Sequence, residues 1–297
     1  MKSKLPKLVV ILGPTASGKT ELAIKLAKKF GGEVVNADSR AIYREMKIGT
    51  DRPEKNEGGV RHHLVGFVAP NKDFSLAEYK KLAVDKINDI VRRGKQPFLV
   101  GGTWLYVRAV VDNLDIPGVK PNKAWRKAQE KFKSETLHKK LKKLDPRAAE
   151  NIHQNDKRRI IRALEVIKFS GKKISEQQIQ GTSLYDVLKI GIRRDLDEIE
   201  KRVRARIKKE MGEKLIRETR QLLKKYSPSL PSMSSLGYRE MGEYLCGKLT
   251  KDDAFELLAK NTRQFARYQI NTFRQDKEIK WVKTVKEAEK RIREFLE

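Results

Sequence analysis

Residues 13–20, GPTASGKT, match the phosphate-binding loop pattern G-x-x-x-x-G-K-[ST] at every constrained position. The backbone N–H groups of such a loop point into one anion-sized concavity, and the helix that follows adds the partial positive charge of its N-terminus. Lys19 supplies a full positive charge, and the Thr20 hydroxyl can reach a Mg²⁺ ion. The motif therefore predicts a polyphosphate site, usually one for ATP or GTP, with Mg²⁺ as cofactor. A purely structural turn is the alternative.

The segments around the loop predict an α/β fold with a parallel sheet. Short apolar runs at residues 8–12, 33–38 and 96–103 predict buried strands, and a helical pattern runs from a capping Ser75 to Gly94. Strands that alternate with helices form parallel sheets, and such sheets bind ligands beyond the carboxyl ends of their strands. We therefore expect a P-loop NTPase-like sheet flanked by helices, with the loop at its carboxyl edge.

A carboxylate, Asp38, follows the second of these strands. A nucleotide triphosphatase or kinase would also be expected to have a strand that ends in a metal-holding Asp, but the third run ends in Gly101, Gly102 and Thr103. The position of Asp38 faces an acceptor more than a metal, so this carboxylate suits removal of a proton from a nucleophile. A local role for Asp38 in an Asx turn or a helix cap is the alternative.

The net charge of +28 predicts a polyanionic partner. Lys and Arg together number 67 against 39 Asp and Glu, and residues 117–194 alone carry 21 basic and 8 acidic residues. A lysine-rich, solvated surface is the alternative, but the concentration of charge in one segment favours a binding surface. Nucleic acid is the leading partner, because each phosphate that a protein neutralises releases condensed counterions.

Changes in pattern along the chain predict an insertion within the core. The prolines and glycine of DIPGVKPNKAW interrupt the alternation of strands and helices, and the basic segment that follows is mostly helical until YDVLKIGIRR indicates a return to the sheet. We predict a first part of the P-loop core at residues 1–116, a mostly helical basic insertion at 117–194, and completion of the core by C-terminal helices at 195–297.

Two long helical patterns follow the insertion. One runs from Leu196 to about Tyr226, and the other runs from Lys251 to Thr272, where Thr250 precedes it as a cap. No apolar run approaches the roughly 20 residues that span a bilayer. The single cysteine, Cys246, excludes an internal disulfide. No secretory signal or zinc-ligand spacing is evident, so a cytoplasmic protein without membrane association or structural zinc is expected, and nothing requires more than a monomer.

The chain resembles the bacterial tRNA dimethylallyltransferases (isopentenyltransferases) over nearly its whole length. The first three of the matching segments are specific in this order, because simple kinases do not share the Asp-Ser-x-x-x-Tyr and Gly-Gly-Thr pair. The segments are GPTASGKT (13–20), ADSRAIYREMKIGTDRP (37–53), LVGGTWLYVRAV (99–110), NDKRRIIRALEVIKFSGKKISE (155–176), SLGYREM (235–241) and NTRQFARYQINTFR (261–274).

The resemblance implies transfer of a dimethylallyl group from dimethylallyl diphosphate to the exocyclic amine of the adenosine 3′-adjacent to the anticodon of tRNA. Diphosphate would leave, and Mg²⁺ on Thr20 would bind it. Asp38 would receive the proton of the amine, and Thr103 would bond a phosphate oxygen or the flipped base beside it. The residues that would bind the diphosphate are Gly13, Pro14, Thr15, Ala16, Ser17, Gly18, Lys19, Thr20 and Arg206.

The same resemblance implies that the anticodon stem-loop binds to a basic surface and that the target base is extruded from its stack. Arg158, Arg159 and Arg162 fall on adjacent turns of one predicted helix, which suits a phosphate track, although a solvated helix face is the alternative for each. Ala41 and Arg158 stand where Gln is common in the family. The implied tRNA-binding residues are Asp38, Ser39, Arg40, Ala41, Thr103, Arg126, Arg158, Arg159, Ile160, Ile161, Arg162, Ser234, Gly237, Tyr238, Arg239, Arg267, Gln269 and Arg274.

Two other functions share part of these features. A P-loop kinase of a nucleoside or small metabolite would have the same loop and sheet, with the arginine-rich insertion as a lid. An RNA-binding protein with a vestigial loop would have the basic surface without any reaction.

Overall fold

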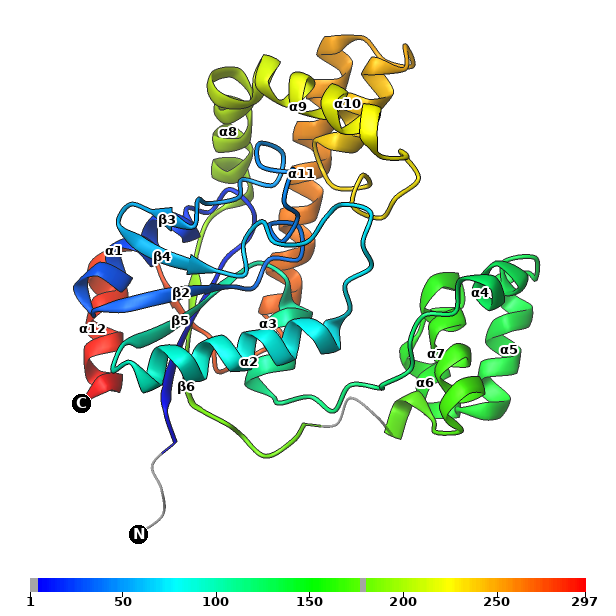
Figure 1. Ribbon diagram of the computed structural model, residues 1–297, viewed down its shortest axis with the longest axis horizontal. Coiled ribbons are helices and arrows are strands. Elements are labelled where there is room, and N and C mark those ends of the chain that lie inside the picture. The colour runs from blue at the N-terminus through cyan, green and yellow to red at the C-terminus, as the bar shows by residue number, and fades with distance from the viewer. Residues whose placement is uncertain (1–4, 177–179) are drawn as a thin grey trace. The chain divides into compact units, whose positions relative to one another are not determined.

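The computed structural model describes residues 5–176 and 180–297 and divides the chain into two compact units (Figure 1). The first unit comprises Met1–Val111 and Leu184–Glu297, and the second comprises Asp112–Ser183. The predicted boundaries of the insertion, 117 and 194, are therefore corrected to earlier positions. The second boundary moves because Asp186–Ile192 forms strand β6, which pairs along its length with the central strand β1 (Lys7–Leu12) of the first unit.

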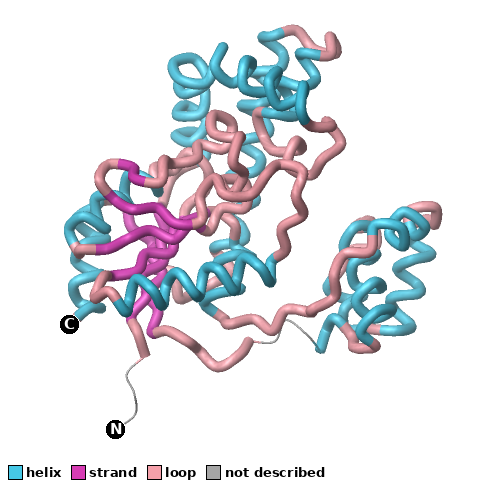
Figure 2. The backbone as a smooth tube through the Cα atoms, viewed as in Figure 1, coloured by secondary structure: helices cyan, strands magenta, loops and turns pink. Residues whose placement is uncertain are grey.

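The first unit is built on a seven-stranded sheet with the order β3-β4-β2-β5-β1-β6-β7, drawn in magenta in Figure 2. All neighbouring pairs are parallel except β3 and β4, which confirms the predicted parallel sheet. The remaining strands are β2 (Gly32–Asn36), β3 (Asn56–Glu57), β4 (Val60–His63), β5 (Gln96–Gly101) and β7 (Lys280–Val282).

Helices cover both faces of this sheet because the side chains of each central strand alternate between them. In β1, Val9 and Ile11 pack with α1 (Lys19–Lys29) and α12 (Val285–Leu296). Leu8, Val10 and Leu12 point to the opposite face, where the buried cluster is completed by α2 (Leu76–Arg92), α3 (Trp104–Val111) and α11 (Lys251–Phe273).

The predicted helix caps are present in the structure. The Ser75 hydroxyl accepts a hydrogen bond from the Glu78 N–H at 3.2 Å at the start of α2. At the start of α11, the Thr250 hydroxyl accepts one from the Asp253 N–H at 3.1 Å. Each bond satisfies a helix N–H that has no partner within the helix. No helix among the described residues is both long and apolar enough to span a membrane.

The long helical pattern predicted from Leu196 to about Tyr226 forms two helices rather than one. α8 (Leu196–Arg206) passes into a π-helical turn at Ile207–Met211, and α9 (Gly212–Lys225) follows. α10 (Tyr238–Leu245) packs between α9 and α11, and α8 packs on α11. α11 therefore connects this helical group with the sheet, as Figure 1 shows.

The second unit is helical, with its own small core around Leu137, Leu141, Ile160 and Leu164. It carries 18 basic and 9 acidic residues between Asp112 and Ser183. The excess of basic over acidic residues is smaller within these bounds than in the predicted segment. The reason is that the basic residues of β6 and of the segment directly after it belong to the sheet unit. Its helices are α4 (Lys123–Gln129), α5 (Ser134–Leu144), α6 (Pro146–Asn151), α7 (Lys157–Ser170) and a 3₁₀ turn at Ile174–Glu176.

Candidate active site

The phosphate-binding loop joins β1 to α1 at the carboxyl edge of the sheet. Its backbone turns through Ala16 and Gly18, whose φ angles are 59° and 85°, and α1 begins immediately afterwards at Lys19. The Pro14 carbonyl closes the turn by accepting from the Ser17 N–H at 3.2 Å. Gly13 has no room for a side chain, since a Cβ there would lie 2.5 Å from the Ser17 hydroxyl. The N-terminus of α1 is therefore directed into the loop, as an anion site requires.

A cavity lies beside the loop and brings together residues from distant parts of the sequence. Thr15, Lys19 and Thr20 line one side, and Asp38 after β2 lines another, together with Asp51 and His62. The structure therefore places three of the predicted loop residues and the predicted carboxylate around the same space, whereas Ser17 and Gly18 line a different cavity. Asp51 and His62 were not predicted to be there.

Asp38 is held by hydrogen bonds of its own turn. Its N–H donates to Asn36 Oδ1 at 3.1 Å, and its carbonyl accepts from Asn36 Nδ2 at 2.9 Å. One carboxyl oxygen accepts from the Arg40 N–H at 2.8 Å, which is the Asx turn considered as the alternative. The second oxygen has no hydrogen bond to residues 5–176 or 180–297. One oxygen therefore positions the carboxylate, and the other keeps its capacity to accept a hydrogen bond from a ligand.

Thr103 is tied to the same turn. Its hydroxyl accepts from the Ser39 N–H at 3.0 Å and lies 3.2 Å from the Ser39 hydroxyl, while its N–H donates to the Ala37 carbonyl at 3.1 Å. This approach requires glycine at the end of β5, because a Cβ on Gly101 would lie 2.1 Å from the Ala37 carbonyl oxygen. The Gly-Gly-Thr sequence thus brings the end of β5 against the turn that carries Asp38.

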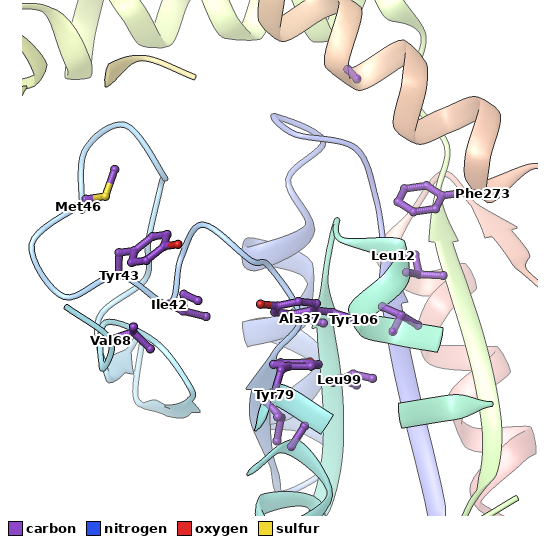
Figure 3. Packing of buried hydrophobic residues seen from close by; sticks show 14 of the residues in the cluster. Leu12, Ala37, Ile42, Tyr43, Met46, Val68, Tyr79, Leu99, Tyr106 and Phe273 are labelled. Atoms are coloured by element: carbon purple, nitrogen blue, oxygen red, sulfur yellow. The ribbon is translucent and has the colours of Figure 1, made fainter. Parts of the chain in front are cut away.

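Two stacked tyrosines lie next to the turn that carries Asp38. The rings of Tyr79 and Tyr106 lie 3.8 Å apart at 21°, and the Tyr79 hydroxyl donates to the Asn36 carbonyl at 2.9 Å. Figure 3 shows both rings beneath the sheet edge, with Tyr106 beside Ala37. Burial raises the pKa of Tyr79 well above its usual value, so this phenol stays protonated and remains a donor.

Two arginines of α8 reach the loop and the cavity by different contacts. The guanidinium of Arg206 bonds the Ile48 carbonyl at 3.2 Å and Asp51 at 2.9 Å, so it reaches the rim of the cavity rather than the loop. Arg202 donates to the Ala16 carbonyl at 2.9 Å and is the α8 arginine that contacts the loop. The four-residue spacing of Arg202 and Arg206 was the available signal, since it places both side chains on one helix face.

His62 is a second residue whose position the sequence did not predict. Its side chain is buried, and its Nδ1 lies 2.9 Å from the Val60 carbonyl. Burial lowers its pKa, which the Val60 carbonyl opposes. The ring is therefore neutral, and Nδ1 carries the proton that the carbonyl accepts.

Several predicted tRNA-binding residues have side chains that are buried against protein in this structure. Tyr238 bonds Glu218 at 2.5 Å and accepts from the Gly49 N–H at 3.1 Å. The apolar pair on α7 faces the core of the second unit because that face is the hydrophobic stripe of the helix. The buried members of the predicted set are Ala41, Ile160, Ile161, Gly237, Tyr238 and Gln269.

The remaining predicted tRNA-binding residues keep some surface. Arg40 is partly exposed and donates to the Pro231 carbonyl at 2.8 Å, which joins the Asp38 turn to the loop before α10. Ser39 and Thr103 are partly exposed beside it. The fully exposed members are Arg158, Arg159, Ser234, Arg239, Arg267 and Arg274.

Two arginines of the second unit that were predicted to bind tRNA form hydrogen bonds with a buried carboxylate. Glu165 on α7 is fully buried and accepts from Arg126 at 2.6 and 2.8 Å, from Arg162 at 2.5 Å and from the Asn122 N–H at 2.7 Å. Burial alone would raise the pKa of Glu165, but these hydrogen bonds outweigh it and hold the pKa below its usual value. Arg126 and Arg162 therefore join α4 to α7.

The residues of the cavity fit a magnesium ion that arrives with a diphosphate. Mg²⁺ is commonly held by one or two protein oxygens, the phosphates of the substrate and several waters. Thr20 and Asp38 line the same cavity and supply oxygens of this kind. Within the described part of the chain, no group of three His, Cys, Asp or Glu side chains forms a cage of its own.

Known proteins match this chain over most of its length. The family model described as IPP transferase matches residues 41–276. The chain belongs to the IPP transferase family. Among its relatives in this family, the tRNA dimethylallyltransferase 2 of Geotalea uraniireducens is 43% identical over 93% of this chain and 92% of its own length. The predicted family resemblance is confirmed.

Solved structures of the family share the fold. The tRNA isopentenylpyrophosphate transferase from Bacillus halodurans superposes with a TM-score of 0.72 at 36% identity, covering 98% of this chain and 95% of its own. A eukaryotic dimethylallyltransferase acting on tRNA superposes with a TM-score of 0.76 at 28% identity, covering 90% of this chain and 69% of its own. The predicted P-loop NTPase-like fold is confirmed with them.

Proposed function

We propose that this chain transfers a dimethylallyl group from dimethylallyl diphosphate to the exocyclic amine of the adenosine 3′-adjacent to the anticodon in tRNA. The relatives in the IPP transferase family that match along nearly the whole chain are named tRNA dimethylallyltransferases. The observation that carries the proposal for this chain is the shared cavity, which has Lys19 and Thr20 of the loop on one side and Asp38 on the other.

The two sides of the cavity match the two halves of the reaction. The exocyclic amine of adenine is a poor nucleophile, because its lone pair is delocalised into the ring. As the new carbon–nitrogen bond forms, the amine loses a proton, and the carboxyl oxygen of Asp38 outside the Asx turn would receive it. The Thr103 hydroxyl accepts a hydrogen bond from the Ser39 N–H, and through this bond it would hold the Asp38 turn and the adjacent adenine in place.

On the opposite side, the carbon–oxygen bond to diphosphate breaks and negative charge accumulates on the leaving oxygens. Lys19, the N-terminus of α1 and the loop N–H groups are fixed before the reaction and face this charge. Mg²⁺ on Thr20 would add Lewis-acid stabilisation of the same charge. The loop would thus hold the group that departs, and the cavity between the two sides would hold the allyl chain.

The tRNA surface of the proposal consists of the exposed basic residues. Arg267 of α11, Arg274 at the C-terminal cap of α11 and Arg239 of α10 belong to the sheet unit, and Arg158 and Arg159 belong to the second unit. Such side chains suit contacts with the phosphates of the anticodon stem-loop, while the target base is extruded into the cavity. The proposal includes a monomer as the active form.

The kinase alternative is not favoured. A kinase would be expected to have a metal-holding carboxylate at the end of the strand next to β1. That strand here is β5, which ends in Gly101. The Ala37 carbonyl occupies the space where a side chain at Gly101 would begin. The only strand-end carboxylate that lines the described cavity is Asp38, after β2.

The test is a product analysis. The protein is incubated with an unmodified tRNA that has adenosine beside the anticodon, together with Mg²⁺ and dimethylallyl diphosphate, and the RNA is digested to nucleosides for mass spectrometry. We expect isopentenyl-adenosine in amounts that depend on both substrates. Absence of this nucleoside would contradict the proposal. A parallel reaction with ATP should leave the tRNA unphosphorylated.

A further inference from the structure

The side chain of Gln269 joins the two halves of the proposed site. Gln269 lies on α11 and is 4% exposed. Its Oε1 accepts from the N–H of Thr15 in the phosphate loop at 2.8 Å, and its Nε2 donates to the carbonyl of Gly102 at 2.8 Å. Gly102 immediately precedes Thr103, which holds the Asp38 turn. One amide therefore connects the loop to the segment that positions the carboxylate.

The chemistry of these two contacts suits an amide. A backbone N–H can only donate and a backbone carbonyl can only accept, so the group between them must accept at one end and donate at the other. Glutamate cannot donate when ionised, and lysine or arginine cannot accept. The contact with Gly102 is buried and the contact with Thr15 is partly buried, and an unpaired N–H or carbonyl is costly in such surroundings. In this structure each polar atom of the Gln269 amide makes a hydrogen bond within the protein.

We propose that Gln269 is a positioning residue, which fixes the distance between the diphosphate loop and the Asp38–Thr103 turn. The proposal rests on the proposed function, because it assigns the loop to the leaving diphosphate and Asp38 to the amine. Bond formation requires the attacked carbon and the base to be aligned within a few tenths of an ångström, and a displacement of about 1 Å costs on the order of 100-fold in rate.

The principal variant is Gln269→Ala, measured against Gln264→Ala as a matched control. Gln264 lies on the same helix and is exposed, so its loss leaves the loop unchanged. For Gln269→Ala we expect kcat/KM for dimethylallyl diphosphate to fall by about 10- to 100-fold. The affinity for tRNA without dimethylallyl diphosphate, measured by filter binding, should stay within about 2-fold of wild type, because the exposed Arg267 and Arg274 remain.

A second variant displaces the amide without changing Gln269. A Cβ on Gly102 would lie 2.5 Å from Gln269 Nε2, which is the end of a flexible side chain, and 3.3 Å from the Gly13 carbonyl oxygen. Gly102→Ala should therefore reproduce the kinetic defect of Gln269→Ala. In the double variant the obstructing amide is absent, so Gly102→Ala should add little further loss. Residues in contact show this kind of non-additivity, whereas independent losses multiply.

The outcomes separate the positioning role from its alternatives. A defect confined to tRNA affinity would overturn the proposal in favour of a direct RNA contact. A lower melting temperature with unchanged KM and kcat in the folded fraction would show a merely structural role and would also overturn it. Multiplicative losses in the double variant would do the same.

The proposed function is tested separately within the same series. The substitution Lys19→Ala, made in an otherwise wild-type protein, should abolish tight binding of dimethylallyl diphosphate. This binding is measured by calorimetry in the presence of Mg²⁺. If Lys19→Ala binds like wild type, the loop does not hold the diphosphate, and the proposed function fails. If Lys19→Ala fails to bind while Gln269→Ala and Gly102→Ala behave like wild type, only the positioning role is overturned.

Discussion

The polar side chains around the cavity of the first unit and the two exposed arginines of α7 in the second unit are held in different ways. At the sheet edge, Asp38 is fixed by an Asx turn and the phosphate loop is fixed by Gln269, both through hydrogen bonds to backbone groups. On α7, by contrast, Arg158 and Arg159 are exposed to solvent. The rate of bond formation depends on short, fixed distances between the reacting groups. The attraction of a protein to phosphates depends mainly on the charge of the protein. On the proposed function, the residues around the cavity would act through their geometry and the exposed arginines of α7 through their charge.

The largest effect is expected from removing the proton acceptor. Asp38→Asn keeps an oxygen that can accept from the Arg40 N–H, so the Asx turn survives while the base is lost. We expect turnover to fall by about 10²- to 10⁴-fold, the usual contribution of a positioned base, with tRNA affinity little altered. Single-turnover kinetics at saturating substrates measure this. Near wild-type turnover would mean that Asp38 acts only through its turn.

The charge of the loop should matter nearly as much. Lys19→Ala is expected to lower kcat/KM for dimethylallyl diphosphate by about 10²- to 10³-fold, because it removes a fixed donor from the leaving group. Lys25→Ala is the matched control, since Lys25 is an exposed lysine of the same helix that is paired with Glu21 at 2.7 Å. Equal effects of the two variants in steady-state kinetics would show that general charge, rather than position, is responsible.

A smaller effect, on binding alone, is expected in the second unit. The double variant Arg158→Ala and Arg159→Ala should weaken tRNA binding and reduce the slope of log affinity against log salt by about 1 to 2. Turnover at saturating tRNA should be unchanged. Lys139→Ala, an exposed lysine of α5 paired with Glu135 at 2.8 Å, serves as control. An unchanged salt dependence would remove this face of α7 from the RNA surface.

The smallest effect on chemistry is expected from Glu165→Gln, which should destabilise the second unit. Its folded pKa is lower than the usual value of 4.5. The ionised form therefore stabilises the fold fully above that value, and the contribution is lost as pH falls through the folded pKa. The melting temperatures of wild type and Glu165→Gln should differ most at neutral pH and converge in acid. A difference that does not depend on pH would contradict this role of the Glu165 carboxylate.

Local patterns in the sequence were sufficient for the parts of the site that depend on neighbouring residues. The phosphate loop follows its strand directly, and Asp38 follows the next one, so the shared edge of a parallel sheet brings them together. The caps at Ser75 and Thr250 are likewise determined within one helical turn. These features could be predicted because sequence distance and spatial distance coincide there.

Contacts between distant segments were not predictable in this way. Gln269 is 254 residues from Thr15, which it bonds, and nothing in the pattern of α11 distinguishes it from the exposed Gln264. Arg126 and Arg162 looked like surface cations, because the burial of Glu165 between them depends on the packing of α4 on α7. A family resemblance assigns a role to a position, whereas the packing decides which atoms remain available for it.

The glycines at the end of β5 also limit what this scaffold can become. A Cβ on Gly101 would lie 2.2 Å from the Ala37 carbonyl carbon as well as 2.1 Å from its oxygen, and one on Gly102 would meet Gln269. An aspartate that replaced Gly101 would have to displace backbone atoms rather than a flexible side chain. Redesign of this protein into a phosphoryl transferase would therefore require rebuilding the strand end, since a point substitution has no space for the missing carboxylate.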